Sequence, residues 1–175
     1  MPAERLIFLD ETGCNAAMGR RIGWSLKGQR VSLEKPAHAS NISLVGAIGL
    51  DGVRPCMTVR GGIDGDAFLA YLREILCPAL RPGDIVVMDN LRVHKVNGVR
   101  ELIEAAGATV CYQPPYSPDF NPIELMWAWM KGQLRGMAPR KVSRLIDAIG
   151  KVALRVEARH CAAWFRHCGY GDQPA

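Results

Sequence analysis

Apolar positions along the chain form short continuous runs and helical stripes, and their order predicts a single α/β domain. Five continuous runs are typical of strands buried on both faces of a sheet, and they cover residues 6–9, 42–50, 53–59, 84–89 and 109–112. The clearest helical stripe spans residues 64–76, where apolar residues recur at three- and four-residue spacing. Further helices are predicted at residues 96–106, 122–134 and 141–165.

The order of these elements predicts the topology of the sheet. Hairpin-type turns join the first three strands, as at Asp51-Gly52, so those strands are expected to be antiparallel. Helices connect the last two strands, which are expected to be parallel to the first. The predicted fold is therefore a mixed five-stranded sheet flanked by helices. Thr12-Gly13 predicts a turn after the first strand, and residues 14–40 are interpreted as an irregular segment around Trp24.

Composition narrows the class of protein. With 49% hydrophobic and 22% charged residues in 175 positions, the chain has globular proportions, and one domain covering residues 1–175 is expected. The N-terminus does not resemble a signal peptide, and no uncharged apolar run approaches the ~18 residues of a membrane span. The six cysteines are dispersed without a CxxC pair, so reduced thiols and a cytoplasmic location are expected.

One local cluster of histidine and cysteine leaves two interpretations open. The dipeptides His160-Cys161 and His167-Cys168 are seven residues apart, so on a helix they share a face. Metal binding is one interpretation, but this spacing fits no zinc pattern. Ordinary helix packing is the favoured interpretation.

Basic residues concentrate toward the C-terminal end of the chain. The net charge is +5, and residues 121–168 carry nine Lys and Arg against three acidic residues. Such a surplus predicts a polyanionic partner, although a solvated helix face would explain it equally well.

Two carboxylates stand at the ends of apolar runs. Asp10 follows the first run and Asp89 ends the fourth. Ligands of α/β sheets gather beyond the carboxyl ends of the strands, so two neighbouring parallel strands would bring both carboxylates into one crevice. Consecutive strand residues point to opposite faces, so only one of Asp10 and Glu11 can face that crevice.

Glu124 is the third candidate carboxylate, and it too has two interpretations. It follows Asn121-Pro122 at a predicted helix start, so Asn121 could cap the helix while Glu124 closes a capping box. Alternatively, Glu124 joins Asp10 and Asp89 in an oxygen-only ligand set, which suits Mg²⁺ or Mn²⁺. Two such ions can activate an attacking oxygen and stabilise the leaving oxygen of a phosphoryl displacement.

Three blocks of the sequence carry a family resemblance. They are residues 8–13 (FLDETG), 87–95 (VMDNLRVHK) and 112–127 (YQPPYSPDFNPIELMW). Together they resemble the catalytic domain of DDE transposases, in the bacterial insertion-sequence branch of the mariner-type superfamily. Asp89 and Glu124 have 34 residues between them, the separation characteristic of that branch. The resemblance extends from about residue 5 to about residue 135.

The resemblance implies a ribonuclease-H-like fold and a reaction on DNA. Asp10, Asp89 and Glu124 would be the catalytic triad that binds Mg²⁺ or Mn²⁺, with two ions expected. The family cuts double-stranded DNA at transposon ends with an activated water and then joins the freed 3′-OH to a target, typically at a TA dinucleotide. A homodimer on DNA and a cytoplasmic, nucleoid-associated location without a membrane are family-level expectations.

Other residues are weaker candidates for roles around the triad. Asn90 resembles the family pattern and could position Asp89 or a backbone phosphate. His94 either orients a phosphate or water or is an ordinary surface or capping histidine. Trp127 and Trp129 are expected in the core. Phosphate contacts that position the duplex without reading its sequence are predicted for Arg20, Arg21, Lys27, Arg30, Lys131, Arg135, Arg140 and Lys141.

The chain also departs from the family pattern. Family members usually carry an N-terminal helix-turn-helix region that recognises transposon ends, whereas here the first catalytic strand lies almost at Met1. We expect a catalytic fragment, a decayed remnant, or the second frame of a split gene whose upstream reading frame supplies the DNA-binding region. The alternative functions are a catalytically inactive DNA-binding remnant or regulator, and another ribonuclease-H-like nuclease acting on RNA–DNA hybrids or junctions.

Overall fold

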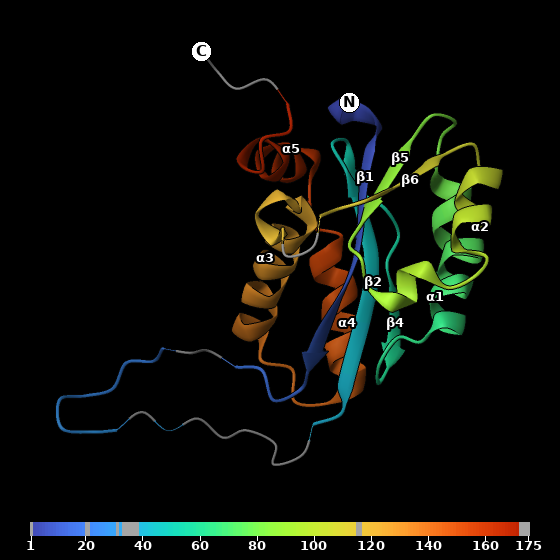
Figure 1. The fold of residues 1–175 in the computed structure, drawn as a ribbon. Coiled ribbons are helices and arrows are strands. Elements are labelled where there is room, and N and C mark those ends of the chain that lie inside the picture. Colours follow the sequence, from blue (N-terminus) through green and yellow to red (C-terminus); the bar gives the residue numbers. More distant parts are fainter. Residues whose placement is uncertain (1, 20–21, 31, 33–38, 115–116, 172–175) are drawn as a thin grey trace.

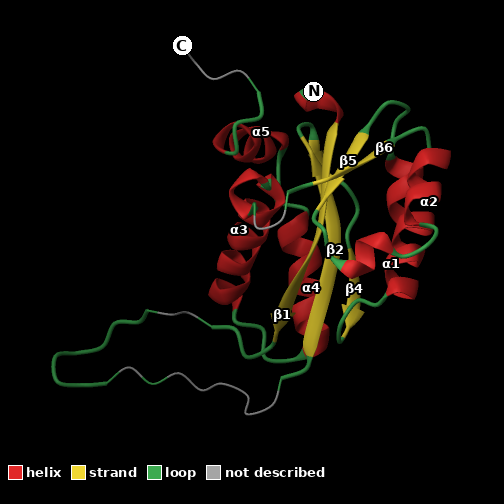
Figure 2. Cartoon of the chain, in the orientation of Figure 1, coloured by secondary structure: helices red, strands yellow, loops and turns green. Residues whose placement is uncertain are grey.

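A sheet of six strands forms the centre of the protein in the computed structural model, which describes residues 2–19, 22–30, 32, 39–114 and 117–171 (Figures 1 and 2). The strand order is β3-β2-β1-β5-β6, and β4 also pairs with β2. The strands are β1 (Leu6–Asn15), β2 (Asn41–Gly49), β3 (Gly52–Val53), β4 (Met57–Arg60), β5 (Ile85–Met88) and β6 (Thr109–Tyr112).

The predicted directions of the strands are confirmed. β2 is antiparallel to β1, and β3 and β4 are both antiparallel to β2. β5 is parallel to β1, and β6 is parallel to β5. The predicted number of five strands is wrong, because the segment 53–59 forms two short strands separated by an interval that contains Pro55. Proline has no N–H to donate to a strand ladder, so the pairing is interrupted there.

The first strand is longer than the apolar run that predicted it. β1 continues through Thr12-Gly13, where a turn was predicted, because β2 pairs with it up to Asn15. The described residues between β1 and β2 form no helix or strand, and the part of this segment around residues 22–30 extends away from the body of the molecule (Figure 1). The prediction of an irregular segment therefore holds for the described residues after the end of β1, whereas residues 20–21, 31 and 33–38 lie outside the described residues.

Helices cover both faces of the sheet (Figures 1 and 2). One face carries α1 (Gly65–Tyr71), which continues as a π-helical turn over Leu72–Leu76, and α2 (Val99–Ala105). The other face carries α3 (Pro122–Met137), α4 (Val142–Ala153) and α5 (Ala158–His167). None of the described helices is long and apolar enough to cross a membrane.

The last predicted helix, residues 141–165, is wrong as a single element. The chain breaks between α4 and α5 around Leu154, whose side chain is 89% exposed. A new helix starts after Glu157, whose backbone N–H donates to Nδ1 of His160 at 3.1 Å. The break allows α5 to return to the sheet, where the ring of Phe165 packs edge-on against Phe8 with centroids 5.3 Å apart. No glycine or proline marks this break.

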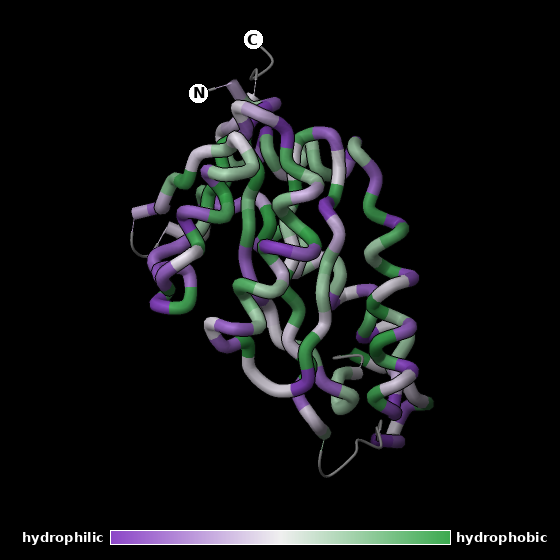
Figure 3. The backbone as a smooth tube through the Cα atoms, turned by 90° about the vertical axis from the view of Figure 1, so that its right-hand side faces the viewer, coloured by the Kyte–Doolittle hydropathy of each residue, from purple (hydrophilic) through white to green (hydrophobic). Residues whose placement is uncertain are grey.

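The core is divided between the two faces, and alternate residues of β1 supply each part. Leu6 and Phe8 pack with α3, α4 and α5, whereas Ile7 and Leu9 pack on the α1 and α2 side. Figure 3 shows the corresponding mixture of hydrophobic and hydrophilic positions along the outer helices. This period of two continues into the residues that follow and sends Asp10 and Glu11 to opposite faces.

Candidate active site

Asp10 is a buried carboxylate in the middle of β1. Only 7% of its surface is exposed, and such a group requires hydrogen-bond donors or a cation. Its Oδ1 accepts the backbone N–H of Glu11 at 2.8 Å, and the side-chain amide of Asn121 lies 3.4 Å from Oδ2.

Asp89 and Glu124 approach Asp10 from neighbouring elements. Phe8 pairs with Val87 in the parallel β1–β5 register, and the same register continued by two residues sets Asp89 level with Asp10. Glu124 lies in the first turn of α3. Burial raises the pKa of Asp10 to about 7, and the charges of Glu124, Glu11 and Asp89 add to this effect, while the Glu11 N–H opposes it. The three predicted carboxylates thus lie close enough for the charges of Asp89 and Glu124 to act on Asp10.

The three carboxylates do not form a closed cage. Among the described residues, no three His, Cys, Asp or Glu side chains are already arranged to hold a metal ion. Glu124 is exposed, and the side chain of Asp89 is 40% exposed. The donor set nevertheless fits a hard divalent cation, because it consists of carboxylate oxygens and because the buried Oδ1 of Asn121, beside Asp10, has no hydrogen-bond partner among the described residues.

The turn after β5 holds one oxygen of Asp89. Its Oδ1 accepts the backbone N–H of Leu91 at 2.9 Å and lies 2.8 Å from Nδ1 of His94. Asp89 therefore also makes the side-chain-to-backbone hydrogen bond that is typical of an aspartate in a turn.

His94 is completely buried, so the interpretation as a surface histidine is wrong. Its Nε2 lies 2.9 and 3.1 Å from the two carboxylate oxygens of Glu11, and its ring packs 4.9 Å from that of Phe68. Burial alone would lower the pKa of His94, but the hydrogen bond and charge of Glu11, together with Asp89, raise it above the ordinary value. Sequence reasoning had set Glu11 aside, because it points away from Asp10.

Asn90 contacts the loop before Glu124 and not Asp89. Its Nδ2 donates to the carbonyl of Gln113 at 2.6 Å, just beyond the end of β6. The Gln113 side chain donates to the carbonyl of Phe120 at 3.0 Å, and the Tyr170 hydroxyl donates to the same carbonyl at 2.9 Å. Gln113 and Tyr170 were missed by sequence reasoning. They anchor the segment that leads into Glu124.

Asn121 does not cap α3 with its side chain, although it occupies the capping position. The Glu124 N–H is accepted by the Asn121 carbonyl at 3.1 Å, and the side chain makes no capping hydrogen bond. The capping-box interpretation is therefore wrong.

A cavity of about 450 Å³ opens beside Glu124, lined also by Asp119, Leu125, His167 and Cys168.

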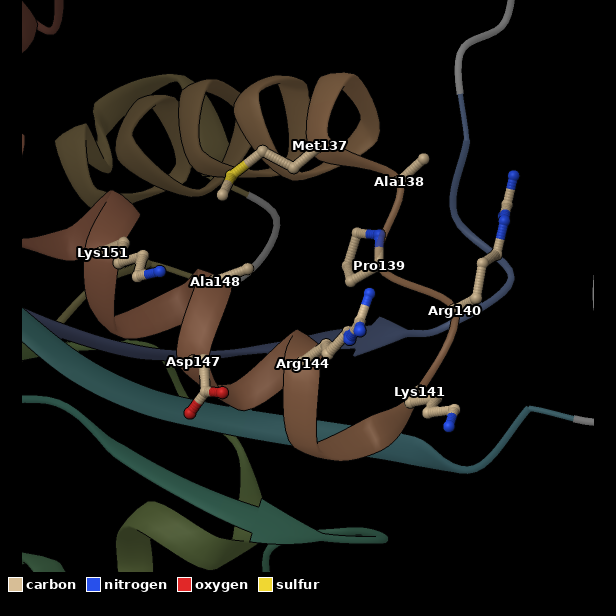
Figure 4. Close-up of a pocket in the computed structure, with 9 residues that line it drawn as sticks. All are labelled: Met137, Ala138, Pro139, Arg140, Lys141, Arg144, Asp147, Ala148 and Lys151. Atoms are coloured by element: carbon tan, nitrogen blue, oxygen red, sulfur yellow. The ribbon is translucent and has the colours of Figure 1, made fainter.

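A basic groove of about 520 Å³ lies at the turn between α3 and α4 (Figure 4). Its cationic side chains are Arg140, Lys141, Arg144 and Lys151, and Asp147 is its acidic residue. None of the four cations forms an ion pair with another described residue. Arg140 donates to the carbonyl of Met18 at 3.2 Å, which ties the groove to the segment after β1. Sequence reasoning had selected Arg140 and Lys141 but not Arg144 or Lys151.

The other predicted DNA-contacting residues are dispersed. Lys131 and Arg135 lie on α3, close enough to β1 for their charges to act on the Cys14 thiol. Lys27 and Arg30 are exposed in the loop that follows β1. Arg20 and Arg21 lie outside the described residues.

His160 takes part in packing and capping at the C-terminal helix. Its ring packs against Trp129 and Trp164, with centroids 5.5 and 6.0 Å away, whereas His167 is exposed. Cys161 is fully buried, and Trp127 is buried in the core as predicted. These contacts support ordinary packing over metal binding for this cluster.

The mixed sheet, the helices on both faces, and the carboxylates in the middle of β1 and directly after β5 define a ribonuclease-H-like fold. The solved structures support this class. A pre-cleavage Mos1 transpososome matches with a TM-score of 0.76 at 14% identity, over 98% of this chain and 57% of that one. The catalytic domain of Mos1 mariner transposase matches with a TM-score of 0.67 at 14% identity, over 94% of this chain and 77% of that one.

The family follows from the sequence comparison. The profile described as DDE superfamily endonuclease matches residues 5–146, so the chain belongs to this family of transposase catalytic domains. A relative, the insertion element IS630 uncharacterized 39 kDa protein of Shigella sonnei, is 28% identical over 130 residues. That match covers 71% of this chain and 37% of the relative. The chain thus spans little more than a third of its relative and 57% of the transpososome protein.

Proposed function

We propose that this chain is a divalent-cation-dependent catalytic domain that cleaves DNA strands and transfers the resulting 3′ ends to a target. One observation carries the proposal: Asp10, Asp89 and Glu124, from two parallel strands and a helix, interact electrostatically in a chain of the DDE family. The proposal of metal-dependent phosphodiester chemistry rests on these carboxylates and on no other charged or amphipathic surface.

In this proposal the three carboxylates hold Mg²⁺ or Mn²⁺. When bound, such ions supply Lewis acidity to the attacking and leaving oxygens of a phosphodiester. Asp10 is kept in place by the Glu11 N–H and by Asn121, while Asp89 is held through Oδ1 by Leu91 and His94. Two ions are proposed, because a pair of ions can activate the attacking oxygen and stabilise the leaving oxygen of a phosphoryl displacement.

The chain's residues assist an in-line attack by water or by a 3′-OH. The protein supplies no covalent nucleophile in this scheme, so its task is to orient carboxylates and DNA. The loop before Glu124, tied by Asn90, Gln113 and Tyr170, keeps Glu124 facing the strand ends. The cavity beside Glu124 provides room for the substrate backbone.

Double-stranded DNA is the proposed partner, and the basic groove is its proposed contact. Four cations without ion pairs among the described residues favour a phosphate backbone. Two of the structural neighbours are Mos1 complexes with transposon ends or in strand transfer. We also propose a homodimer on DNA, end recognition by a region encoded in an upstream reading frame, and action at the nucleoid in the cytoplasm.

A nicking assay tests the proposal. The purified chain is incubated with supercoiled plasmid and with duplexes that carry the inverted repeats flanking the gene, in Mg²⁺, Mn²⁺ or EDTA. Cleavage is expected only with a divalent cation, and Asp89→Asn and Glu124→Gln should each lower it at least 100-fold. Asp66→Asn, a change at an exposed aspartate of α1, is the matched control and should keep full activity.

The same assay separates the alternative functions. Salt-sensitive DNA binding without cleavage in either metal would instead support a non-catalytic remnant or regulator. Preferential cleavage of an RNA–DNA hybrid or a four-way junction would support a different ribonuclease-H-like nuclease. Full activity of Asp89→Asn would contradict the assignment of the site.

A further inference from the structure

Glu11 is linked to both aspartates of the site, to Asp10 directly and to Asp89 through His94, although its side chain lies on the opposite face of the sheet from Asp10. Its backbone N–H donates to Oδ1 of Asp10 at 2.8 Å. Its side-chain oxygens lie 2.9 and 3.1 Å from Nε2 of His94, and Nδ1 of His94 lies 2.8 Å from Oδ1 of Asp89. A continuous path of short contacts thus runs from Asp10 through Glu11 and His94 to Asp89.

The imidazole in this path has no freedom to turn. It is fully buried, and Phe68 packs against its ring at 4.9 Å. Nε2 faces the carboxylate of Glu11, and Nδ1 faces both the main-chain carbonyl of Asp89 at 3.2 Å and its Oδ1 at 2.8 Å. All of these oxygens accept hydrogen bonds, so both ring nitrogens are held by partners. The carbonyl of His94 also accepts the Tyr112 hydroxyl at 3.0 Å. The ring can therefore hold Asp89 only in the orientation that Glu11 sets.

We propose that Glu11 is a positioning residue of the active site, which acts through His94 to fix the orientation of Asp89. This inference rests on the proposed function, because it concerns the cation site of that reaction. His94 and the Leu91 N–H hold Asp89 through Oδ1, and these contacts would fix the orientation in which its other oxygen meets a cation. Partners that hydrogen-bond to a ligating carboxylate typically change metal affinity or activity by about 10–100-fold when they are lost.

Two conservative substitutions separate positioning from charge. Glu11→Asp keeps the charge but withdraws the carboxylate by one methylene, so the contact to Nε2 is lost. Glu11→Gln removes the charge but keeps a side chain of the same length, whose amide can accept from or donate to Nε2. Both variants keep the backbone N–H that binds Asp10.

The experiment measures Mn²⁺ affinity of the full chain by electron paramagnetic resonance of the free ion, without DNA. We expect Glu11→Asp to weaken Mn²⁺ binding about tenfold and Glu11→Gln to stay within about threefold of the wild type. Cleavage of plasmid should fall in the same order. Glu74→Asp and Glu74→Gln, at an exposed position after α1, are the matched controls and should change neither readout. Melting temperatures exclude a loss of folding.

The outcomes distinguish this inference from the proposed function. If Asp89→Asn abolishes Mn²⁺ binding while both Glu11 variants bind like the wild type, the role of Glu11 is overturned and the cation site stands. A larger loss in Glu11→Gln than in Glu11→Asp would show that charge alone matters, which also overturns the positioning role. If the wild type binds no Mn²⁺, the cation site itself fails, and the inference fails with it.

Discussion

Asn121 directs its side-chain NH2 at Asp10, a residue 111 positions earlier in the chain, and its side-chain oxygen Oδ1 has no hydrogen-bond partner in the part of the chain that the structure describes. The contact joins the start of α3 to the middle of β1. Since Glu124 lies one turn further along α3, this single amide helps to set the approach of one carboxylate to another. Asn121 thus occupies the capping position of α3, but its side chain binds Asp10 and does not cap the helix.

Substitution of Asn121 distinguishes a donor to Asp10 from a helix cap. A cap would tolerate Asn121→Asp, because Asp and Asn are equally good capping residues, and would suffer from Asn121→Ala. A donor to Asp10 predicts the reverse order, because aspartate would place a second carboxylate against the first. We expect Asn121→Ala to cost about 1–3 kcal/mol in the free energy of unfolding and Asn121→Asp to cost more at pH 8. Urea denaturation of both variants measures the order.

The raised pKa of Asp10 predicts a pH-dependent gain in stability on its removal. A carboxyl whose pKa is about 7 in the folded state and 3.8 in the unfolded state favours folding at low pH, and this contribution is lost as the pH rises toward 7. At pH 8 and in EDTA, Asp10→Asn should therefore unfold at a higher temperature than the wild type. One pKa unit corresponds to about 1.4 kcal/mol, so a gain of about 1–4 kcal/mol is expected.

The gain should disappear near pH 4, where the wild-type carboxyl is protonated in the folded state. Thermal melts at both pH values, with Asp66→Asn as the exposed control, provide the comparison. An Asp10→Asn variant that is less stable than the wild type at pH 8 would argue against the electrostatic conflict inferred for the site.

The basic groove predicts a change in the salt dependence of DNA binding. Each phosphate contact contributes about 0.9 to the slope of log K against log salt concentration. Arg144→Gln and Lys151→Gln together should lower the absolute slope by about 2, measured by fluorescence anisotropy with duplex DNA. Arg73→Gln, an equal change at an exposed position on the α1 side, should leave the slope unaltered; the same reduction in both proteins would refute a local contact.

The close approach of α3 to the sheet predicts that Gly46 cannot be enlarged. Gly46 pairs with Asp10 in the β1–β2 register, and a methyl group there would lie 2.5 Å from Cys56 Sγ and 3.1 Å from the Trp127 ring. Gly46→Ala should therefore cost about 1–3 kcal/mol in the free energy of unfolding. Adding Cys56→Ala should recover part of that loss in a double-mutant cycle. If it recovers none, Trp127 alone is the obstacle.

The parts of the fold that could be predicted are those in which local pattern and burial agree. Strands buried on both faces produce continuous apolar runs, so β1, β2, β5 and β6 were recognised, and with them Asp10 and Asp89 at the ends of these runs, although β1 continues beyond Asp10 to Asn15. Glu124 could be recognised as a candidate from the helix start at Asn121-Pro122 and from the family resemblance. The strand count failed at Pro55, where one apolar run contains two ladders.

The parts that could not be predicted depend on partners remote in sequence. Nothing near Leu154 marks the end of α4, because the break is imposed by the packing of α5 against β1. The pairing of Glu11 with His94 spans 83 residues, and alternation along β1 indicates only that Glu11 faces away from Asp10. Which side chain Glu11 contacts on that face is determined only when the helices pack against the sheet.

Tyr170, which hydrogen-bonds to the loop before Glu124 and packs 4.9 Å from Phe8, sets a practical boundary for anyone who shortens or labels the protein. A truncation after α5 would keep all three acidic residues of the site, but it would remove the hydrogen bond that Tyr170 makes to the loop before Glu124. A purification tag or fluorophore attached near Tyr170 could disturb its hydrogen bond to that loop, so assays of tagged protein need an untagged comparison.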